Sequence, residues 1–187
     1  MSEFVSLKDH FLVSLPDANI APMLDEAVVY LCAHTPEGAY GLIINKPLSV
    51  SFAETLQELG LNPLGEFNQP VFMGGPVQRQ SGLVLHTAVS PAYRSFSPIS
   101  DDICITSSLD ILEDMAIHCG PKKILFALGY VKWEKNELET QFLENSWLHV
   151  PACQKILFDT RPEERWTAAI QQLGIAPFGF LHEAAHA

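Results

Sequence analysis

The sequence predicts an α+β protein built on one largely antiparallel sheet that can close into a barrel. Two observations lead to this class. About nine short apolar runs of strand length recur along the 187 residues, and about four segments with helical periodicity stand singly between them. Strict alternation of strand and helix, which a parallel sheet requires, is absent.

The first three apolar runs are expected strands. Residues 10–15 stop at Pro16, and residues 27–33 are continuously apolar, as in a strand that is buried on both faces. Residues 39–45 follow after the turn at residues 34–38. Because only this short turn separates the second run from the third, we expect a hairpin.

Helix signals come next in the chain. Ser51 and Glu54 have the spacing of a capping box, in which each side chain accepts a hydrogen bond from the other residue's backbone amide. Apolar stripes and glycine stops support the other helices. The expected helices, caps included, are residues 51–60, 107–120, 136–144 and 160–174. The later expected strands are residues 71–73, 83–87, 103–106, 123–131, 147–150 and 156–158, whereas residues 90–101 read as irregular.

The composition is that of a folded domain. Hydrophobic residues make up 48% of the chain and charged residues 18%, which excludes intrinsic disorder. We expect a single domain over residues 1–175 and a frayed tail over residues 176–187, where no periodicity continues. No apolar run approaches the ~18 residues of a membrane span. Residues 1–10 lack the pattern of a secretory signal, so a cytoplasmic location is expected.

The charge balance argues against nucleic acid as a partner. Eleven Lys and Arg residues face 22 Asp and Glu residues, a net charge of −11. The densest basic cluster is the pair Lys122 and Lys123. Because DNA binding needs basic residues that neutralise phosphates, direct DNA binding is not expected, and acidic membrane surfaces are disfavoured for the same reason.

The cysteines indicate a reducing compartment. Cys32, Cys104, Cys119 and Cys153 are widely spaced and form no C-x-x-C motif. Cys32, Cys104 and Cys119 have apolar surroundings in the sequence, so we expect these three to be small buried residues. Cys153, on an expected loop, is the leading candidate for a nucleophile.

Several short strings suggest sites, each with a structural alternative. Residues 74–76 (Gly-Gly-Pro) form either a tight turn or an anion-binding loop. His34, Asn45 and His86 stand at expected strand ends, and His34 and Asn45 are expected near each other across the hairpin. Each of these side chains either has a structural role or belongs to a nucleophilic set. Residues 182–186 spell H-E-x-x-H, but so close to the end of the chain that we interpret the match as chance and expect no metal site.

Aromatic and acidic residues are expected to group late in the chain. Tyr130, Trp133 and Trp147 lie near Glu137 and Glu139 in the sequence. Such a group can line a site for a sugar or a protein, or the carboxylates can do acid–base work. The alternative is a solvated face of a short acidic helix.

Four strings in order resemble the bacterial YqgE/AlgH family. They are His10–Pro16, Gly38–Pro47, Gly74–Val77 with Leu85–His86, and Gly129–Tyr130 through Trp133 and Leu138–Glu139 to Asn145–Leu148. The match runs from about His10 to Ile175. The resemblance implies a bifurcated sheet with a small barrel, flanked by helices, in a bacterial cytoplasmic protein. It implies no reaction, and the family's label of transcriptional regulator comes without a recognised DNA-binding motif.

The fourth string departs from the family pattern, which reads Gly-Tyr-x-Gly-Trp-x-x-Gly-Gln-Leu-Glu. Here Lys132 and Asn136 replace two glycines, and Glu137 replaces the glutamine. Glycine allows a positive φ or a close approach to a ligand. Asn136 still tolerates such a turn, whereas Lys132 is less suited to it.

These observations favour a non-enzymatic interaction or regulatory module with no cofactor, whose partner is a protein or a small molecule. The alternative is a small-molecule-binding protein or hydrolase-like enzyme with a pocket near Asn45, Gly74, Gly75 and His86. The candidate ligand or partner surface consists of His34, Asn45, Lys46, Gly74, Gly75, Pro76, His86, Tyr130, Trp133, Glu139 and Trp147.

Overall fold

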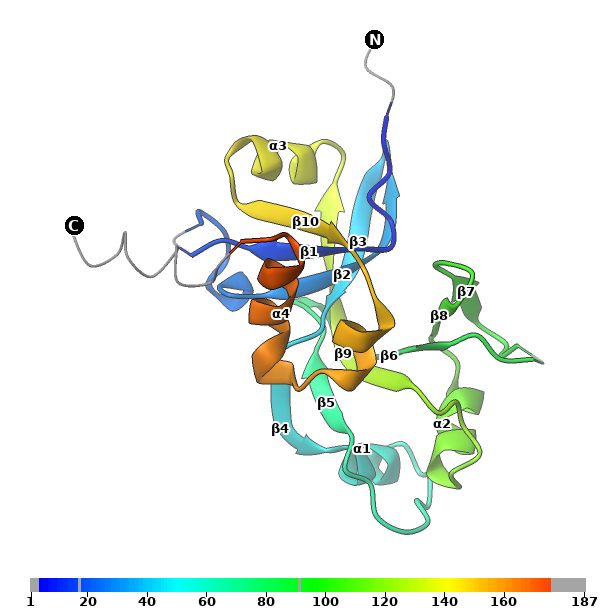
Figure 1. The fold of residues 1–187 in the computed structure, drawn as a ribbon. Coiled ribbons are helices and arrows are strands. Elements are labelled where there is room, and N and C mark those ends of the chain that lie inside the picture. Colours follow the sequence, from blue (N-terminus) through cyan, green and yellow to red (C-terminus); the bar gives the residue numbers. More distant parts are fainter. Residues whose placement is uncertain (1–3, 17, 91, 176–187) are drawn as a thin grey trace.

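The computed structural model describes residues 4–175 except residues 17 and 91, and these form a ten-stranded sheet curled into a half-barrel (Figure 1). The strands are β1 (His10–Ser14), β2 (Val28–Thr35), β3 (Gly38–Ile43), β4 (Pro47–Ser51), β5 (Pro70–Met73), β6 (Val77–Thr87), β7 (Phe96–Pro98), β8 (Ile103–Thr106), β9 (Ile124–Glu134) and β10 (Trp147–Pro151). The helices are α1 (Phe52–Glu58), α2 (Leu109–Ala116), α3 (Glu137–Leu143) and α4 (Arg165–Gln172). The short turns of helix are η1 (Pro22–Leu24), η2 (Lys155–Asp159) and η3 (Pro162–Glu164).

The predicted fold class is confirmed. The main sheet runs in the order β10-β1-β2-β3-β9-β6-β8-β7, and β4 and β5 form a branch that joins at β9. All pairs are antiparallel except β5 with β9, which is parallel. In the part of the chain that the structure describes, no helix has the length and apolarity to cross a membrane. The expected tail and its H-E-x-x-H string lie outside the described residues.

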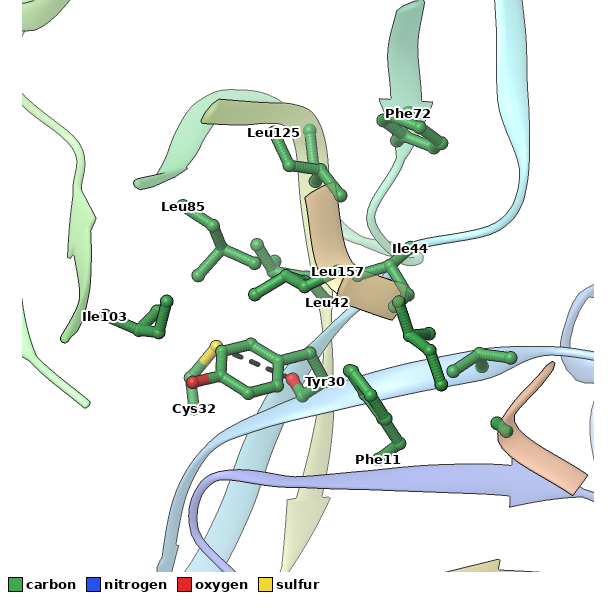
Figure 2. Close-up of a cluster of buried hydrophobic side chains, with 14 of the residues drawn as sticks. Phe11, Tyr30, Cys32, Leu42, Ile44, Phe72, Leu85, Ile103, Leu125 and Leu157 are labelled. Carbon is green, nitrogen blue, oxygen red and sulfur yellow. Dashed lines mark hydrogen bonds between the residues drawn. The ribbon is translucent and has the colours of Figure 1, made fainter. Parts of the chain in front are cut away.

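The continuous apolar runs are explained by burial on both faces of the sheet. Successive side chains of a strand point to opposite faces. In β1, Phe11 joins the cluster beneath α4 and η2, whereas Leu12 joins the cluster beneath α3. In β2, Tyr30 joins the cluster beneath α4 and η2, whereas Val29 joins the cluster beneath α3. Figure 2 shows the first cluster, with Phe11 and Tyr30 beside the aliphatic side chains of the neighbouring strands.

A third apolar cluster lies at the other end of the sheet. It packs Phe52 and Leu56 of α1 and Met115 of α2 against Val84 of β6 and Phe126 of β9. Figure 1 shows α1 and α2 together at this end and α3 at the opposite end. Strand β9 connects the two ends, because its first half pairs with β5 and β6 and its second half pairs with β3.

Local signals account for several boundaries. The predicted capping box is present: the Ser51 Oγ accepts from the Glu54 amide at 3.1 Å, and the Glu54 carboxylate accepts from the Ser51 amide at 3.0 Å. Asn136 precedes α3 with φ of 63°, so it takes the left-handed turn that it was expected to tolerate. The strand expected at residues 156–158 is wrong. These residues lie in the π-helical turn η2, where neighbouring Ile156 and Leu157 are both buried, a pattern that a strand with one exposed face does not give.

Candidate functional site

His34 connects β2 to α3. A bulge between Leu31 and Ala33 shifts the register of β2. The His34 Nδ1 accepts from the backbone amide of Leu7 at 2.9 Å, and its Nε2 lies 2.9 Å from the Glu139 carboxylate. Because an amide only donates, the ring proton belongs on Nε2, where it is donated to Glu139. His34 and Glu139, both predicted as site residues, thus contact each other, and both ring nitrogens of His34 are engaged in hydrogen bonds.

His86 is buried in β6 and is equally satisfied. Its Nδ1 lies 2.8 Å from the Thr87 carbonyl oxygen and its Nε2 lies 2.8 Å from the Thr106 hydroxyl. Because a carbonyl only accepts, Nδ1 carries the proton and Nε2 accepts from Thr106. Burial lowers the pKa of His86, which favours this neutral form.

Asn45 and Lys46 fix the loop after β3. The Asn45 Oδ1 accepts from the Val28 amide at 2.8 Å, and its Nδ2 donates to the Glu26 carbonyl at 2.8 Å. The Lys46 ammonium donates to the Asp25 carbonyl at 2.6 Å. The expected proximity of His34 to Asn45 is wrong, because Asn45 binds the start of β2 whereas His34 lies near its end.

Residues 74–76 pass closely over β9. A Cβ atom on Gly75 would lie 2.2 Å from the Tyr130 carbonyl oxygen, and one on Gly74 would lie 2.2 Å from that of Gly129. These contacts leave no room for a Cβ atom, which explains both glycines without a ligand. The Gly74 amide already donates to the Leu128 carbonyl oxygen at 2.8 Å. This geometry favours the turn alternative. Pro76 then leads directly into β6.

The predicted aromatic residues, which belong to β9 and β10, divide between the two faces of the sheet. Trp133 and Trp147 pack edge to face with ring centroids 6.0 Å apart, and both indole N–H groups donate to the Gln141 Oε1, at 3.0 and 2.8 Å. Both tryptophans are buried beneath α3. Tyr130 packs on the opposite side, against the cluster beneath α4.

Tyr130 faces a hollow of about 460 Å³, which we call the tyrosine hollow. The strands β2, β3, β6 and β9 supply its walls, and Tyr40 of β3 meets Tyr130 edge to face at a centroid distance of 6.1 Å. The lining residues are Ala33, Thr35, Glu37, Gly38, Ala39, Tyr40, Leu83, Tyr130, Lys132 and Trp133. Within the described residues, neither tyrosine hydroxyl has a hydrogen-bond partner. Burial raises the pKa of Tyr40 to about 12, so its hydroxyl remains a donor.

Charged groups surround the opening of the tyrosine hollow. The Lys132 ammonium lies 2.6 Å from the Glu134 carboxylate, whose hydrogen bond raises the lysine pKa. Lys135 lies 3.6 Å from Glu37. A ligand would therefore meet two phenol hydroxyls and exposed groups of both signs around an apolar wall.

Of the residues that line this hollow, Tyr130 and Trp133 are predicted from the sequence as site residues, whereas Tyr40, Glu37 and Lys132 are not. The pairing of Tyr40 with Lys132 across β3 and β9 places them together. A signal for Tyr40 was present, since it lies within the second family-like string. None of Asn45, Gly74, Gly75 and His86 lines this hollow.

Two of the three thiols that were expected to be buried are buried, whereas the expectation for Cys119 is wrong: this residue lies beyond the end of α2 and is exposed. All four cysteines are free, and Cys32 and Cys104 are buried. Burial raises the pKa of the Cys32 thiol well above its ordinary value. The Cys153 Sγ is half-buried and lies 3.6 Å from the Gln172 side-chain oxygen. Among the described residues, no three His, Cys, Asp or Glu side chains are grouped as a metal site would need.

Comparison with known proteins identifies the family. The family model described as AlgH-like matches residues 11–178. The chain belongs to the AlgH-like family. A UPF0301 protein of Pectobacterium atrosepticum is 42% identical to this AlgH-like chain, over 98% of the chain and 100% of the relative. One of Saccharophagus degradans is 41% identical, over 92% of the chain and 85% of the relative.

Solved structures share the AlgH-like fold. The solution structure of the AlgH protein from Pseudomonas aeruginosa matches with a TM-score of 0.80 at 38% identity, covering 94% of this chain and 93% of that chain. A protein from Corynebacterium diphtheriae matches with a TM-score of 0.72 at 14% identity, covering 92% and 90%, and shows likeness of fold alone. Within the AlgH-like chain, Lys132 takes a regular strand position on β9, so its side chain can line the hollow without backbone strain.

Proposed function

We propose that this AlgH-like protein is a non-enzymatic interaction module that binds a partner through the tyrosine hollow, without direct contact to DNA. The observation that carries the proposal is the pair Tyr40 and Tyr130, which line a hollow of about 460 Å³ and whose hydroxyls have no hydrogen-bond partner in the described residues. Tyrosine offers a large, rigid contact area together with a polar tip, which suits it to binding sites.

The hydrogen bonds of the histidines support a binding role over a catalytic one. A general base must reach the proton that it removes. In His34 and His86, both ring nitrogens are held by groups of the protein itself. Asn45 is likewise bonded through both of its side-chain atoms. These side chains stabilise the fold at the positions that they occupy.

The charge of the chain supports a partner other than nucleic acid. With 22 acidic and 11 basic residues, the protein has a net charge of −11, which disfavours its approach to the phosphates of nucleic acid. We place the module in the bacterial cytoplasm, and its four free cysteines are in keeping with that compartment. Sequence-specific binding of duplex DNA at about 150 mM salt, in the presence of competitor DNA, would contradict the proposal.

The test compares partner capture by wild-type protein and by two variants of the tyrosine hollow. Tyr130→Phe removes one hydroxyl and keeps the ring, and Lys132→Ala removes the charge. We expect the partner recovered from bacterial cytoplasm with wild-type protein to be lost or weakened with both. Leu143→Ser, at an exposed position on α3, is the matched control and should recover the partner normally.

A second measurement addresses the enzymatic alternative. A broad hydrolase screen should give no turnover that follows the folded protein. Turnover abolished by His86→Gln or Cys153→Ala would overturn the proposal, as would a partner retained equally by both hollow variants.

A further inference from the structure

An exposed apolar patch covers the α1–α2 end of the molecule. Five large apolar side chains there are between 38% and 58% exposed: Val50, Leu59, Leu64, Leu109 and Ile117. Leu59 directly follows α1, and Leu109 and Ile117 lie at the two ends of α2. The Leu64 amide donates to the Ala116 carbonyl at 2.8 Å, which ties the loop after α1 to α2. We call these five side chains the α1–α2 patch.

Three of the five patch residues line a groove of about 390 Å³. Val50, Leu59 and Leu109 line this groove, and Leu112 and Phe126 of the third apolar cluster extend the same surface inwards. Around the groove, the patch is thus continuous with the core, and the Leu64 amide bond to Ala116 places Leu64 beside the end of α2 that carries Ile117. Contiguous exposed apolar surface with a polar rim is typical of interaction sites.

Acidic residues dominate the segments that carry the patch. Residues 47–78 and 107–121 contain no Lys or Arg. Their acidic residues are Glu54, Glu58, Glu66, Asp110, Glu113 and Asp114. Glu58 lines the groove, and exposed Glu113 lies one helical turn from Leu109, on the same side of α2. Two basic residues lie nearby: Arg79 lines the groove, and Arg94 donates through its backbone amide to the Asp110 carboxylate at 2.9 Å.

We propose that the α1–α2 patch is a docking site for a cationic amphipathic helix of a partner protein. The apolar stripe of such a helix covers the exposed leucines and the groove, and its Lys and Arg residues face the acidic side chains of α1 and α2. A second copy of this chain would bring acidic surface against acidic surface, and an anionic membrane would be repelled in the same way. The site is separate from the tyrosine hollow and does not rest on its function.

The test uses a labelled helical peptide as the probe. It has about 14 residues, or roughly four turns, with leucine at helical spacing on one face and lysine elsewhere. We expect saturable binding at about 150 mM salt that weakens as salt rises. A peptide with glutamate in place of lysine, and one with serine in place of leucine, should bind much more weakly.

Protein variants locate the binding. Leu109→Ser and Leu59→Ser should each lower the affinity for the peptide by about tenfold, as expected for the loss of one leucine that becomes buried on binding. Two positions are used so that a local distortion at one does not decide the result. Glu113→Lys should weaken binding less and reduce its salt dependence. Leu143→Ser, which changes an 85% exposed leucine on α3, should have no effect, and neither should Tyr130→Phe.

Several outcomes would overturn the inference. The first is equal binding of the lysine and glutamate peptides, or an equal loss with Leu143→Ser. The second is a concentration-dependent dimer in sedimentation that Leu109→Ser dissociates, which would assign the patch to a second copy. The third is the absence of peptide binding to the protein. If the protein then binds phosphatidylglycerol vesicles, the patch is assigned to a membrane surface instead. Loss of peptide binding with Tyr130→Phe alone would assign the peptide to the tyrosine hollow instead.

Discussion

Arg165 at the start of α4 donates from its Nη1 to the carbonyl oxygen of Ile44, 121 residues earlier in the chain. The guanidinium is buried, lies 5.0 Å from the ring centroid of Phe72, and also donates through Nε to the Thr160 carbonyl at 3.0 Å. Burial lowers its pKa to about 10. One side chain therefore joins α4 to the end of β3 and to β5.

Replacing Arg165 should destabilise the protein. Arg165→Met keeps an apolar stem but leaves the Ile44 and Thr160 carbonyl oxygens without this donor. Each buried acceptor left unpaired costs about 1–3 kcal/mol, which outweighs the relief of no longer burying a charge. We expect the free energy of unfolding in urea to fall by about 2 kcal/mol or more. Arg161→Met, at an exposed site, is the control and should change it little. Equal stability of Arg165→Met and wild type would contradict this.

Gly129 and Gly174 form a matched pair for a steric prediction. Their φ angles are 74° and 75°, but a Cβ at Gly129 would lie 2.5 Å from the Gly75 carbonyl oxygen, whereas one at Gly174 would meet nothing within 4 Å. Gly174→Ala should cost only the strain of a left-handed residue, about 1–2 kcal/mol. Gly129→Ala should cost several kcal/mol more, because the backbone of residues 74–75 must move away from β9 to make room for the methyl group. Thermal unfolding of the two variants measures the difference, and similar melting temperatures would show that β9 and residues 74–75 separate easily.

Local sequence signals predicted the parts of the fold that depend on neighbouring residues. The apolar run at residues 27–33 predicted a strand buried on both faces, and Ser51 with Glu54 predicted the start of α1. The short strand β7 was missed, because a three-residue edge strand carries too little pattern. Strand β4 was missed because most of its residues are exposed, so its sequence lacks a buried face.

The candidate site was less predictable because it depends on long-range pairing. Tyr40 and Lys132 meet only because β3 pairs with β9 in one register. The bulge in β2 has no distinct sequence signal, and the exchange of partners along β9 depends on the whole sheet. The resemblance to a family implied a bifurcated sheet with a small barrel, but it gave no pairing between these residues.

Gln141 should be important for stability although it is a polar residue on a short helix. Its Oε1 accepts from both Trp133 and Trp147. Gln141→Leu keeps the volume but leaves two indole N–H groups without a partner, at a cost of about 1–3 kcal/mol each. We expect a lower free energy of unfolding and a changed tryptophan emission spectrum in the folded state. Glu144→Gln, one turn away and exposed, should alter neither. An unchanged unfolding free energy in Gln141→Leu would mean that the indoles find other acceptors.

The stability of the protein should fall as the pH decreases below neutrality, and His86 should cause part of the fall. Burial lowers the pKa of His86 in the folded state below its ordinary value of 6.5, so the unfolded chain binds a proton more readily. Stability is therefore retained above pH 6.5 and is lost as the pH falls through that value towards the folded pKa. One such proton contributes a slope of at most about 1.4 kcal/mol per pH unit.

The check is urea unfolding between about pH 7.5 and pH 5, where histidine is the side chain that ordinarily titrates. His86→Gln removes the titrating group and should reduce the slope of unfolding free energy against pH, whatever it does to stability at pH 7.5. Part of the slope should remain, because burial and the neighbouring His10 lower the pKa of His149 as well. Val84→Ala, a buried change on the same strand, is the control for lost stability alone, and it should retain the wild-type slope. A full wild-type slope in His86→Gln would show that the acid sensitivity originates elsewhere in the protein.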